Sequence, residues 1–259
     1  MDFAGFSIEL LSLLFVIAIV AGLLDTLAGG GGLISIPALI LSGIPPLAAL
    51  GTNKLQGSMG TATATFILIK KNKISLSENI PLMKSAFIGA VIGTVMVQFI
   101  DTDILSFVIP IVLLFIAVYF LISPKSKKSS NKKLVSDNKY KNIIIPFIGI
   151  YDGMFGPGTG SFFTLAGVTC KGHEIISSTA IAKALNFSTN IASLIVFLAA
   201  GQVVWVVGVL MMLGQVIGAW IGSHLLYKVN PSYLRVIIVL MCTGMLIKYS
   251  HSMGWIVFA

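Results

Sequence analysis

The stretch GLLDTLAGGGGLISIPALIL, residues 22–41, places one aspartate and four consecutive glycines inside an otherwise apolar run. Glycine adopts backbone angles with positive φ at little cost, so this run predicts a helix that is interrupted in its middle. In a bilayer, an interruption exposes backbone groups that must find partners inside the protein. The stretch therefore predicts a broken membrane helix with Asp25 just before the break.

The composition of the whole chain is typical of a membrane protein. Of its 259 residues, 56% are hydrophobic and only 10% are charged, whereas soluble domains carry about 25% charged residues. A bilayer core of about 30 Å needs about 20 apolar residues per helix. The predicted fold is therefore an all-α, polytopic transmembrane helical bundle. About eight apolar windows follow one another, at residues 8–40, 46–69, 81–100, 104–122, 143–168, 175–200, 203–227 and 233–247.

The formal charge of +8 does not indicate nucleic-acid binding, because the lysines lie in short loops beside apolar spans. Two lysine-rich loops, residues 70–84 and 124–142, flank a loop that carries Asp101 and Asp103. Cytoplasmic loops of membrane proteins carry an excess of Lys and Arg, so both lysine-rich loops are expected in the cytoplasm. The expected surroundings are a lipid bilayer, with no nucleic-acid partner.

The segment 124–142, rich in Lys, Ser and Asn, predicts a flexible cytoplasmic linker between two similar halves, residues 1–123 and 143–259. The halves carry the same motifs in the same order: GLLDTLAGGG (22–31) aligns with GIYDGMFGPG (149–158), ALGTNK (49–54) with STAIAK (178–183), and GAVIG (89–93) with GAWIG (218–222). We expect two homologous four-helix repeats. Each has a broken first helix, a helix with a buried lysine, a glycine-rich packing helix and a plain span.

The relative direction of the repeats depends on how each broken helix crosses the membrane. If it makes a single crossing, each half has an even number of spans, the repeats run parallel and both termini are cytoplasmic. If one half-helix is instead re-entrant, the repeats become inverted. Both arrangements occur in secondary transporters, whose sites lie near the bilayer midplane where interrupted helices meet.

The two glycine-rich breaks are candidate anion sites. A half-helix that begins at a break presents unpaired N–H groups and a partly positive end, which favours a bound anion. We expect the two ends to face one another and to bind substrate through their backbone. The residues concerned are Gly30, Gly31 and Gly32 in the first half, and Gly158, Thr159 and Gly160 in the second.

Two lysines, Lys54 and Lys183, lie deep in their predicted spans, where an unpaired charge costs about 3 kcal/mol or more. Asp25 and Asp152 also lie inside apolar spans and are expected to compensate these charges. An incoming anion would then compete with the aspartates for the lysines. Under the alternative interpretation, the charges are structural ion pairs that join helices.

Neutral hydrogen-bonding side chains lie near both lysines. Thr52 and Asn53 precede Lys54, and Asn186 follows Lys183 by three positions, which places both on one helix face. Such groups suit an oxyanion. The alternative is that they bond to neighbouring helices or to their own backbone, as Ser, Thr and Asn often do in membrane helices.

The duplicated pattern resembles the sulfite exporter TauE/SafE family, also called the toluene-sulfonate uptake permease family. The resemblance rests on AGGGGLISIPAL and ALGTNKLQ in the first half, and on YDGMFGPGTGSFFTLA and STAIAKALN in the second. It implies a transporter of the bacterial inner (cytoplasmic) membrane for sulfite, sulfonates or related small sulfur-containing anions. It does not identify which of these anions is the substrate.

Other function classes fit the residues less well. An intramembrane serine protease would need a serine beside a histidine base, for which Ser161, His173 and His224 are candidates. A nucleotide-driven pump would need a GxxxxGK[ST] loop, which the sequence lacks. A passive anion channel would use the same lysines and helix ends as a carrier. If transport is coupled, Asp25 or Asp152 would bind H⁺, or carbonyls at a break would bind Na⁺. No cofactor and no enzymatic activity are expected.

Overall fold

A computed structural model describes residues 2–3, 5–122, 133–226, 228–229 and 231–252. Apart from one short antiparallel ladder, β1 (Asp2–Phe3) with β2 (Phe6–Ser7), the regular structure of this part of the chain is helical, which confirms the predicted all-α class. The helices of the first half are α1 (Ile8–Ala28), α2 (Gly32–Leu41), α3 (Pro46–Lys70), α4 (Leu76–Val97) and α5 (Thr102–Ile122). Those of the second half are α6 (Asp137–Lys139), the π-helix η1 (Tyr140–Ile144), α7 (Ile145–Met154), α8 (Thr159–Lys171), α9 (Ile175–Ala199), α10 (Trp205–Leu225) and α11 (Pro231–Ser252).

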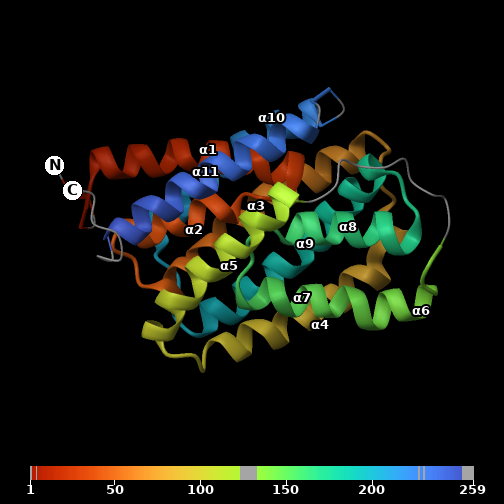
Figure 1. Ribbon diagram of the computed structural model, residues 1–259, viewed down its shortest axis with the longest axis horizontal. Coiled ribbons are helices and arrows are strands. Elements are labelled where there is room, and N and C mark those ends of the chain that lie inside the picture. The colour runs from red at the N-terminus through yellow and green to blue at the C-terminus, as the bar shows by residue number, and fades with distance from the viewer. Residues whose placement is uncertain (1, 4, 123–132, 227, 230, 253–259) are drawn as a thin grey trace.

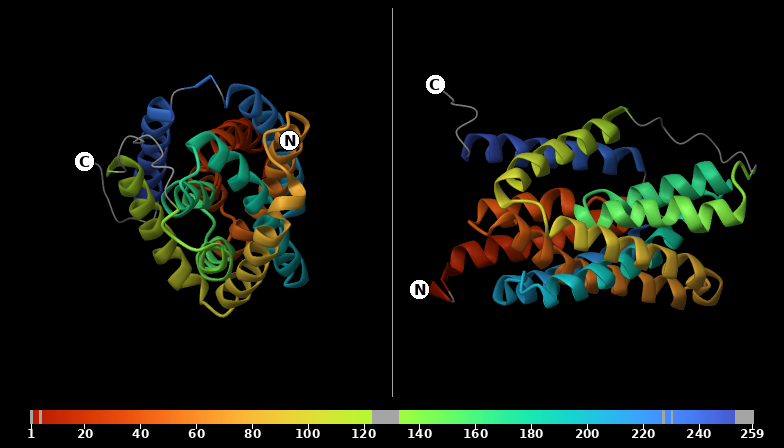
Figure 2. Two further views of the ribbon diagram at one scale, coloured as in Figure 1. Left: turned by 90° about the vertical axis from the view of Figure 1, so that its right-hand side faces the viewer. Right: turned by 90° about the horizontal axis from the view of Figure 1, so that it is seen from below.

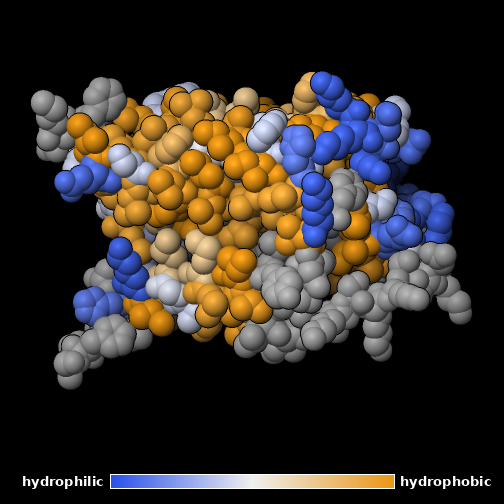
Figure 3. Space-filling view, turned by 90° about the horizontal axis from the view of Figure 1, so that it is seen from above, coloured by the Kyte–Doolittle hydropathy of each residue, from blue (hydrophilic) through white to orange (hydrophobic). Residues whose placement is uncertain are grey.

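The molecule has the surface of a multi-pass membrane protein. Among the described residues, the helices that are long and apolar enough to cross a bilayer are α1, α4, α5, α9 and α10. Large apolar side chains such as Phe66, Phe99, Phe115 and Phe147 point outward and are mostly exposed, as expected for side chains that contact lipid. Figure 3 shows hydrophobic residues across the middle of the molecule and hydrophilic residues gathered toward its ends.

The first broken helix reverses direction at its break. Gly29 ends α1 with φ of 74°, in the left-handed region that glycine adopts easily. After the turn, α2 runs back along α1, so that Leu14 in the first half of α1 shares an apolar cluster with Leu39 near the end of α2 and with Ile44 just after it. The two half-helices therefore form a hairpin, which is the arrangement expected of the re-entrant alternative.

The second broken helix forms the equivalent hairpin from α7 and α8. Gly156 and Gly158 in the turn both have positive φ. Tyr140 and Ile145 at the beginning of this hairpin cluster with Phe163 and Ala166 of α8. The N–H groups of residues 134 and 135 donate to the backbone oxygen of residue 170 at the other end. In Figure 1 the beginning of α1 and the end of α11 lie on one side of the molecule, and α6 lies on the other.

The hairpins pack crosswise, each against a glycine-rich helix of the other half. α1 packs against α10, and α7 packs against α4. A Cβ atom added at Gly218 of α10 would lie 2.0 Å from the Ile19 oxygen, and one added at Gly89 of α4 would lie 2.2 Å from the Pro146 oxygen. A Cβ at Gly93 would lie 2.0 Å from the Ile150 oxygen, and one at Gly222 would lie 2.8 Å from Thr26 Cβ. The prediction that these glycines allow close helix packing is confirmed.

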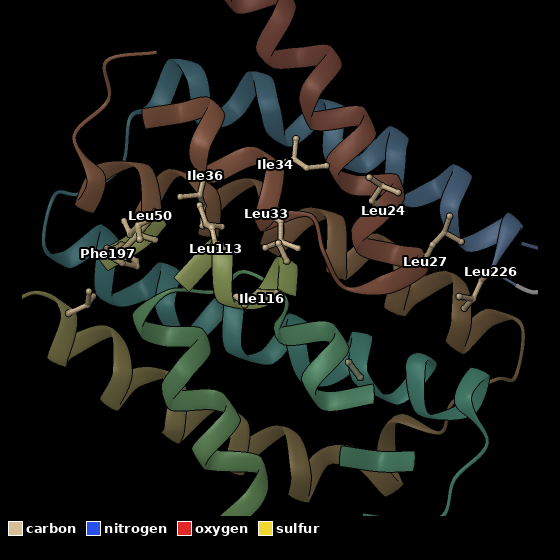
Figure 4. Close-up of a cluster of buried hydrophobic side chains, with 14 of the residues drawn as sticks. Leu24, Leu27, Leu33, Ile34, Ile36, Leu50, Leu113, Ile116, Phe197 and Leu226 are labelled. Atoms are coloured by element: carbon tan, nitrogen blue, oxygen red, sulfur yellow. The ribbon is translucent and has the colours of Figure 1, made fainter. Parts of the chain in front are cut away.

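The lysine-bearing helices α3 and α9 cross the centre of the bundle, where they contact each other as well as α10 and α4. A large apolar cluster surrounds this centre, with Leu24, Leu33 and Leu50 of the first half and Phe197 of α9 among its members (Figure 4). α5 and α11 pack together at the edge of the bundle, as the end-on view of Figure 2 shows. Of the linker predicted at 124–142, residues 124–132 lie outside the described part, and residues 137–142 are helical.

Candidate functional site

Two lysine ammonium groups are buried at the centre of the molecule. Lys54 lies near the middle of α3 and Lys183 near the middle of α9, and each residue is only 1% exposed. Burial of an isolated ammonium ion is costly, so each requires an oppositely charged or strongly polar partner. The surroundings of both lysines supply one.

Each lysine pairs with the aspartate of the other half. The Nζ atom of Lys54 lies 3.0 Å from Asp152 Oδ2 and donates to the Asp152 backbone oxygen at 2.7 Å. The Nζ atom of Lys183 lies 3.4 Å from Asp25 Oδ2 and donates to the Asp25 backbone oxygen. Each ammonium thus binds both the carboxylate and the last turn of a broken helix. The expected charge compensation is present, and it joins the two halves.

The two breaks lie against each other. A Cβ atom at Gly29 would lie 2.4 Å from the Ser161 nitrogen, and one at Gly32 would lie 3.3 Å from Pro157 Cα. The Gly31 N–H, at the start of α2, donates to Asp25 Oδ1 at 3.4 Å. The beginnings of α2 and α8 therefore meet at the centre, next to the ion pairs, where their backbone N–H groups favour negative charge.

A small polar cavity of about 20 Å³ lies at this centre, roughly the room that one water needs. Its walls are three of the four charged groups, glycines of both breaks and a set of amide side chains, while Lys183 does not line it. The wall residues are Asp25, Gly31, Gly32, Asn53, Lys54, Gly57, Asp152, Gly156, Asn186, Asn190 and Gln215.

The side-chain oxygens of Asn53 and Asn186 both accept hydrogen bonds within the protein. Asn53 Oδ1 accepts from Ser35 Oγ at 2.6 Å and from a neighbouring glutamine at 3.1 Å. Asn186 Oδ1 accepts from the side chains of residues 189 and 190, both at 3.5 Å. The Nδ2 donors lie near the half-helix starts, 3.7 Å from a Cβ at Gly32 for Asn53 and 3.7 Å from a Cβ at Gly160 for Asn186. Each half therefore combines a lysine, an amide donor and a helix start.

Other predicted site residues lie around this centre and do not line the cavity. Gly160 is close to Lys183, since its Cβ would lie 3.2 Å from the lysine Nζ. Thr52 accepts a hydrogen bond from the Val204 N–H at 3.0 Å, and Thr159 donates to the oxygen of residue 156 at 2.8 Å. Gly30 and Gly158 are buried in the turns themselves.

Four wall residues are not among the predicted site residues: Gly57, Gly156, Asn190 and Gln215. Gly57 follows Lys54 by three positions and so lies on the same face of α3. Gln215 is a polar residue in an otherwise apolar helix, and it is buried. A polar residue inside an apolar span is itself a signal for a functional interior, because it would otherwise face lipid at a cost.

The geometry gives no support to a protease or a metal centre in the described part of the chain. Ser161 Oγ donates to the Ala28 backbone oxygen, and His224 Nδ1 contacts the Trp220 oxygen at 2.8 Å. His173 lies outside the spans in the turn before α9, where burial, followed by the charges of two nearby lysines, lowers its pKa. No group of three or more His, Cys, Asp or Glu side chains suited to a metal ion occurs among the described residues.

Similarity to known proteins covers almost the entire chain. The family described as "Sulfite exporter TauE/SafE" matches residues 14–249. A "Probable membrane transporter protein" of Haemophilus influenzae is 40% identical over 248 residues, which cover 96% of this chain and 97% of that protein. The "Probable membrane transporter protein YfcA" of Escherichia coli K12 is 38% identical over 239 residues, covering 92% of this chain and 89% of the relative. No solved structure gives a significant match.

Proposed function

The chain belongs to the sulfite exporter TauE/SafE family, and from this premise we propose that it is a secondary transporter of small sulfur-containing oxyanions in the bacterial inner membrane. The family and the names of its relatives support a membrane transporter. The choice of an oxyanion as substrate rests on the chemistry of the centre.

One observation carries the proposal: two buried lysines bind carboxylates at the meeting point of two helix starts. A sulfite or sulfonate group carries the same kind of charge-bearing oxygens as these carboxylates. It would replace an aspartate at a lysine and accept further hydrogen bonds from Asn53, Asn186 and the backbone at Gly31. Charge-assisted hydrogen bonds of this kind are about twice as strong as neutral ones.

A carrier suits this centre better than an open pore. The cavity holds about one water, whereas a sulfur oxyanion is several times larger. Substrate binding therefore requires the two hairpins to separate, and transport requires their separation toward each side in turn. Both hairpins end at the centre, which makes them the natural moving parts.

In the proposed membrane topology the two halves are inverted repeats. Each hairpin enters and leaves from one side, so α3 and α9, the helices that follow the hairpins, start on opposite sides. With the lysine-rich α3–α4 loop in the cytoplasm, both chain termini then lie outside. The apolar windows at 8–40 and 143–168 act as re-entrant hairpins, and the other windows as full crossings.

Cysteine labelling tests this topology. In a variant with Cys170 and Cys242 replaced by alanine, we expect a membrane-impermeant maleimide to label Glu9→Cys and Asp103→Cys in intact cells. Ser77→Cys, at the lysine-rich end, should react only after permeabilisation. All of these positions are exposed. If Glu9→Cys and Ser77→Cys instead behaved alike, the repeats would be parallel and the proposed topology would be wrong.

Transport is tested by exchange of labelled anion across proteoliposomes that contain the purified protein. The probes are sulfite, thiosulfate and methanesulfonate, each with protein-free liposomes as background. We expect saturable exchange of at least one anion, and a loss of at least about 100-fold in the double variant Lys54→Met, Asp152→Asn, which removes one charged pair without leaving a partner behind. Lys139→Met, at an exposed lysine outside the centre, is the matched control and should retain full exchange. A double variant as active as wild type would favour purely structural ion pairs.

A further inference from the structure

The two lysine–aspartate pairs are equivalent in the alignment of the halves but differ in their access to solvent. The carboxylate of Asp152 is 2% exposed and lies 3.0 Å from the Lys54 ammonium. The carboxylate of Asp25 is 17% exposed and lies 3.4 Å from the Lys183 ammonium. The Asp25 pair is thus the looser and more accessible one.

A second asymmetry lies one turn before each aspartate. Gly22 and Gly149 both approach a helix of the other half at a position that the alignment equates, Gln215 and Ala86. A Cβ at either glycine would lie 2.5 Å from the backbone oxygen of this residue, but at Gly22 it would also lie 2.8 Å from the side-chain Oε1 of Gln215. The Asp25 side therefore has a polar amide where the Asp152 side has a methyl group. This difference is separate from the difference in exposure, and it makes the surroundings of Asp25 more polar than those of Asp152.

The charges that surround Asp25 come from several helices. Lys183 of α9 contacts it, and Lys54 of α3 and Asp152 of α7 share its cavity. Three other helices pack on α1 near the centre. Two of them, α2 and α8, present glycines there, and the third, α10, presents the neutral Gln215. Of the titratable side chains of α11 that the structure describes, Lys248 and His251 are exposed, and the buried Tyr249 donates to the Ser106 backbone oxygen at 2.9 Å. Within the described chain, the charges of the centre cancel.

Because these charges cancel, a bound monoanion leaves a net charge of −1 in surroundings where an unbalanced charge is expensive. One proton on an aspartate restores neutrality. The proton forms an O–H bond on a carboxylate oxygen, the carboxylate releases its lysine, and the lysine ammonium remains charged to bind the anion. Lys183 retains its hydrogen bond to the Asp25 backbone oxygen during this change.

We propose that Asp25 is the proton-binding group that couples anion movement to the pH gradient, and that the Asp152–Lys54 pair stays ionised as a fixed part of the site. This inference rests on the proposed transport function. It makes transport of a monoanion with one proton electroneutral, so a pH gradient drives it and a membrane voltage does not.

The test measures accumulation and exchange in the same proteoliposomes, with labelled sulfite, thiosulfate and methanesulfonate. An acidic exterior should drive accumulation in the wild type, by at most about tenfold per pH unit for one proton. Entrapped pyranine should report proton influx together with methanesulfonate. In Asp25→Asn, accumulation should fall to the level without a gradient, while exchange continues with altered affinity. Asp25→Glu, which keeps a carboxylate, should restore gradient-driven accumulation. Asp152→Asn should lose both activities.

The outcomes separate the two proposals. If the wild type exchanges none of the probes, the proposed function fails and this inference fails with it. If the wild type exchanges an anion but ignores the pH gradient, or if Asp25→Asn still accumulates it, only the coupling role of Asp25 is overturned. Sulfite itself binds protons near neutral pH, so its flux is compared between proteins at one pH. If Asp25→Asn does not fold, Asp25→Asn, Lys183→Gln, which leaves neither partner charged, replaces it in the accumulation assay.

Discussion

Replacing Lys54 by methionine should lower the free energy of unfolding by about 3–5 kcal/mol, because it leaves Asp152 as a buried carboxylate without its charged partner. The Asp152 side chain is only 2% exposed, so little solvent reaches it to screen the lost charge. Asp152→Asn alone should also destabilise the protein, because it leaves the buried Lys54 ammonium without its charged partner. Both losses are measured by unfolding the purified protein in mixed micelles with increasing SDS.

The double variant Lys54→Met, Asp152→Asn should recover most of this stability. Replacing both partners of a buried pair is often close to neutral, whereas removal of one is costly. Lys139→Met, at an exposed site, should change the free energy of unfolding by less than about 0.5 kcal/mol. If Lys54→Met were as stable as the double variant, the Lys54–Asp152 contact would not hold the halves together.

Gly218→Val should lower the free energy of unfolding by a similar amount, about 3 kcal/mol, because it overpacks the contact between α10 and α1. The Cβ atom would lie 2.0 Å from the Ile19 backbone oxygen and 2.7 Å from the Leu23 nitrogen, and backbone atoms cannot rotate out of the way. α1 would have to move away from α10, which would also displace Asp25 from Lys183. We expect little monodisperse protein on size-exclusion chromatography and a large fall in melting temperature.

Gly89→Val is the matched substitution in the first half, where the Cβ atom meets the Pro146 oxygen at 2.2 Å. It should be equally destabilising. Gly244→Val in α11, where a Cβ meets nothing within 4 Å, is the control for a glycine replaced in an apolar helix. If the Gly218 and Gly244 variants were equally stable, close packing of α1 on α10 would not determine the fold.

The amino-acid sequence by itself determined the helical class, the membrane setting and the two interruptions. These properties depend on local chemistry: apolar windows of membrane length, and glycine runs that a continuous helix does not need. It also indicated the candidate site residues Asp25, Lys54, Asp152 and Lys183, because a charged residue inside an apolar span is costly and usually functional. Ion pairing between these residues followed from charge balance alone.

Only the tertiary structure decided how the two halves combine. A glycine run permits both a kink and a reversal, and the apolar contacts of α1 with α2 select the reversal. The crossed pairing of lysines and aspartates depends on distances between residues about 100 or more positions apart, such as 98 for Lys54 and Asp152. The wall position of Gln215 and the tighter burial of Asp152 likewise arise from packing. Local sequence specifies which conformations a segment can adopt, and long-range contacts select the one that buries its charges in pairs.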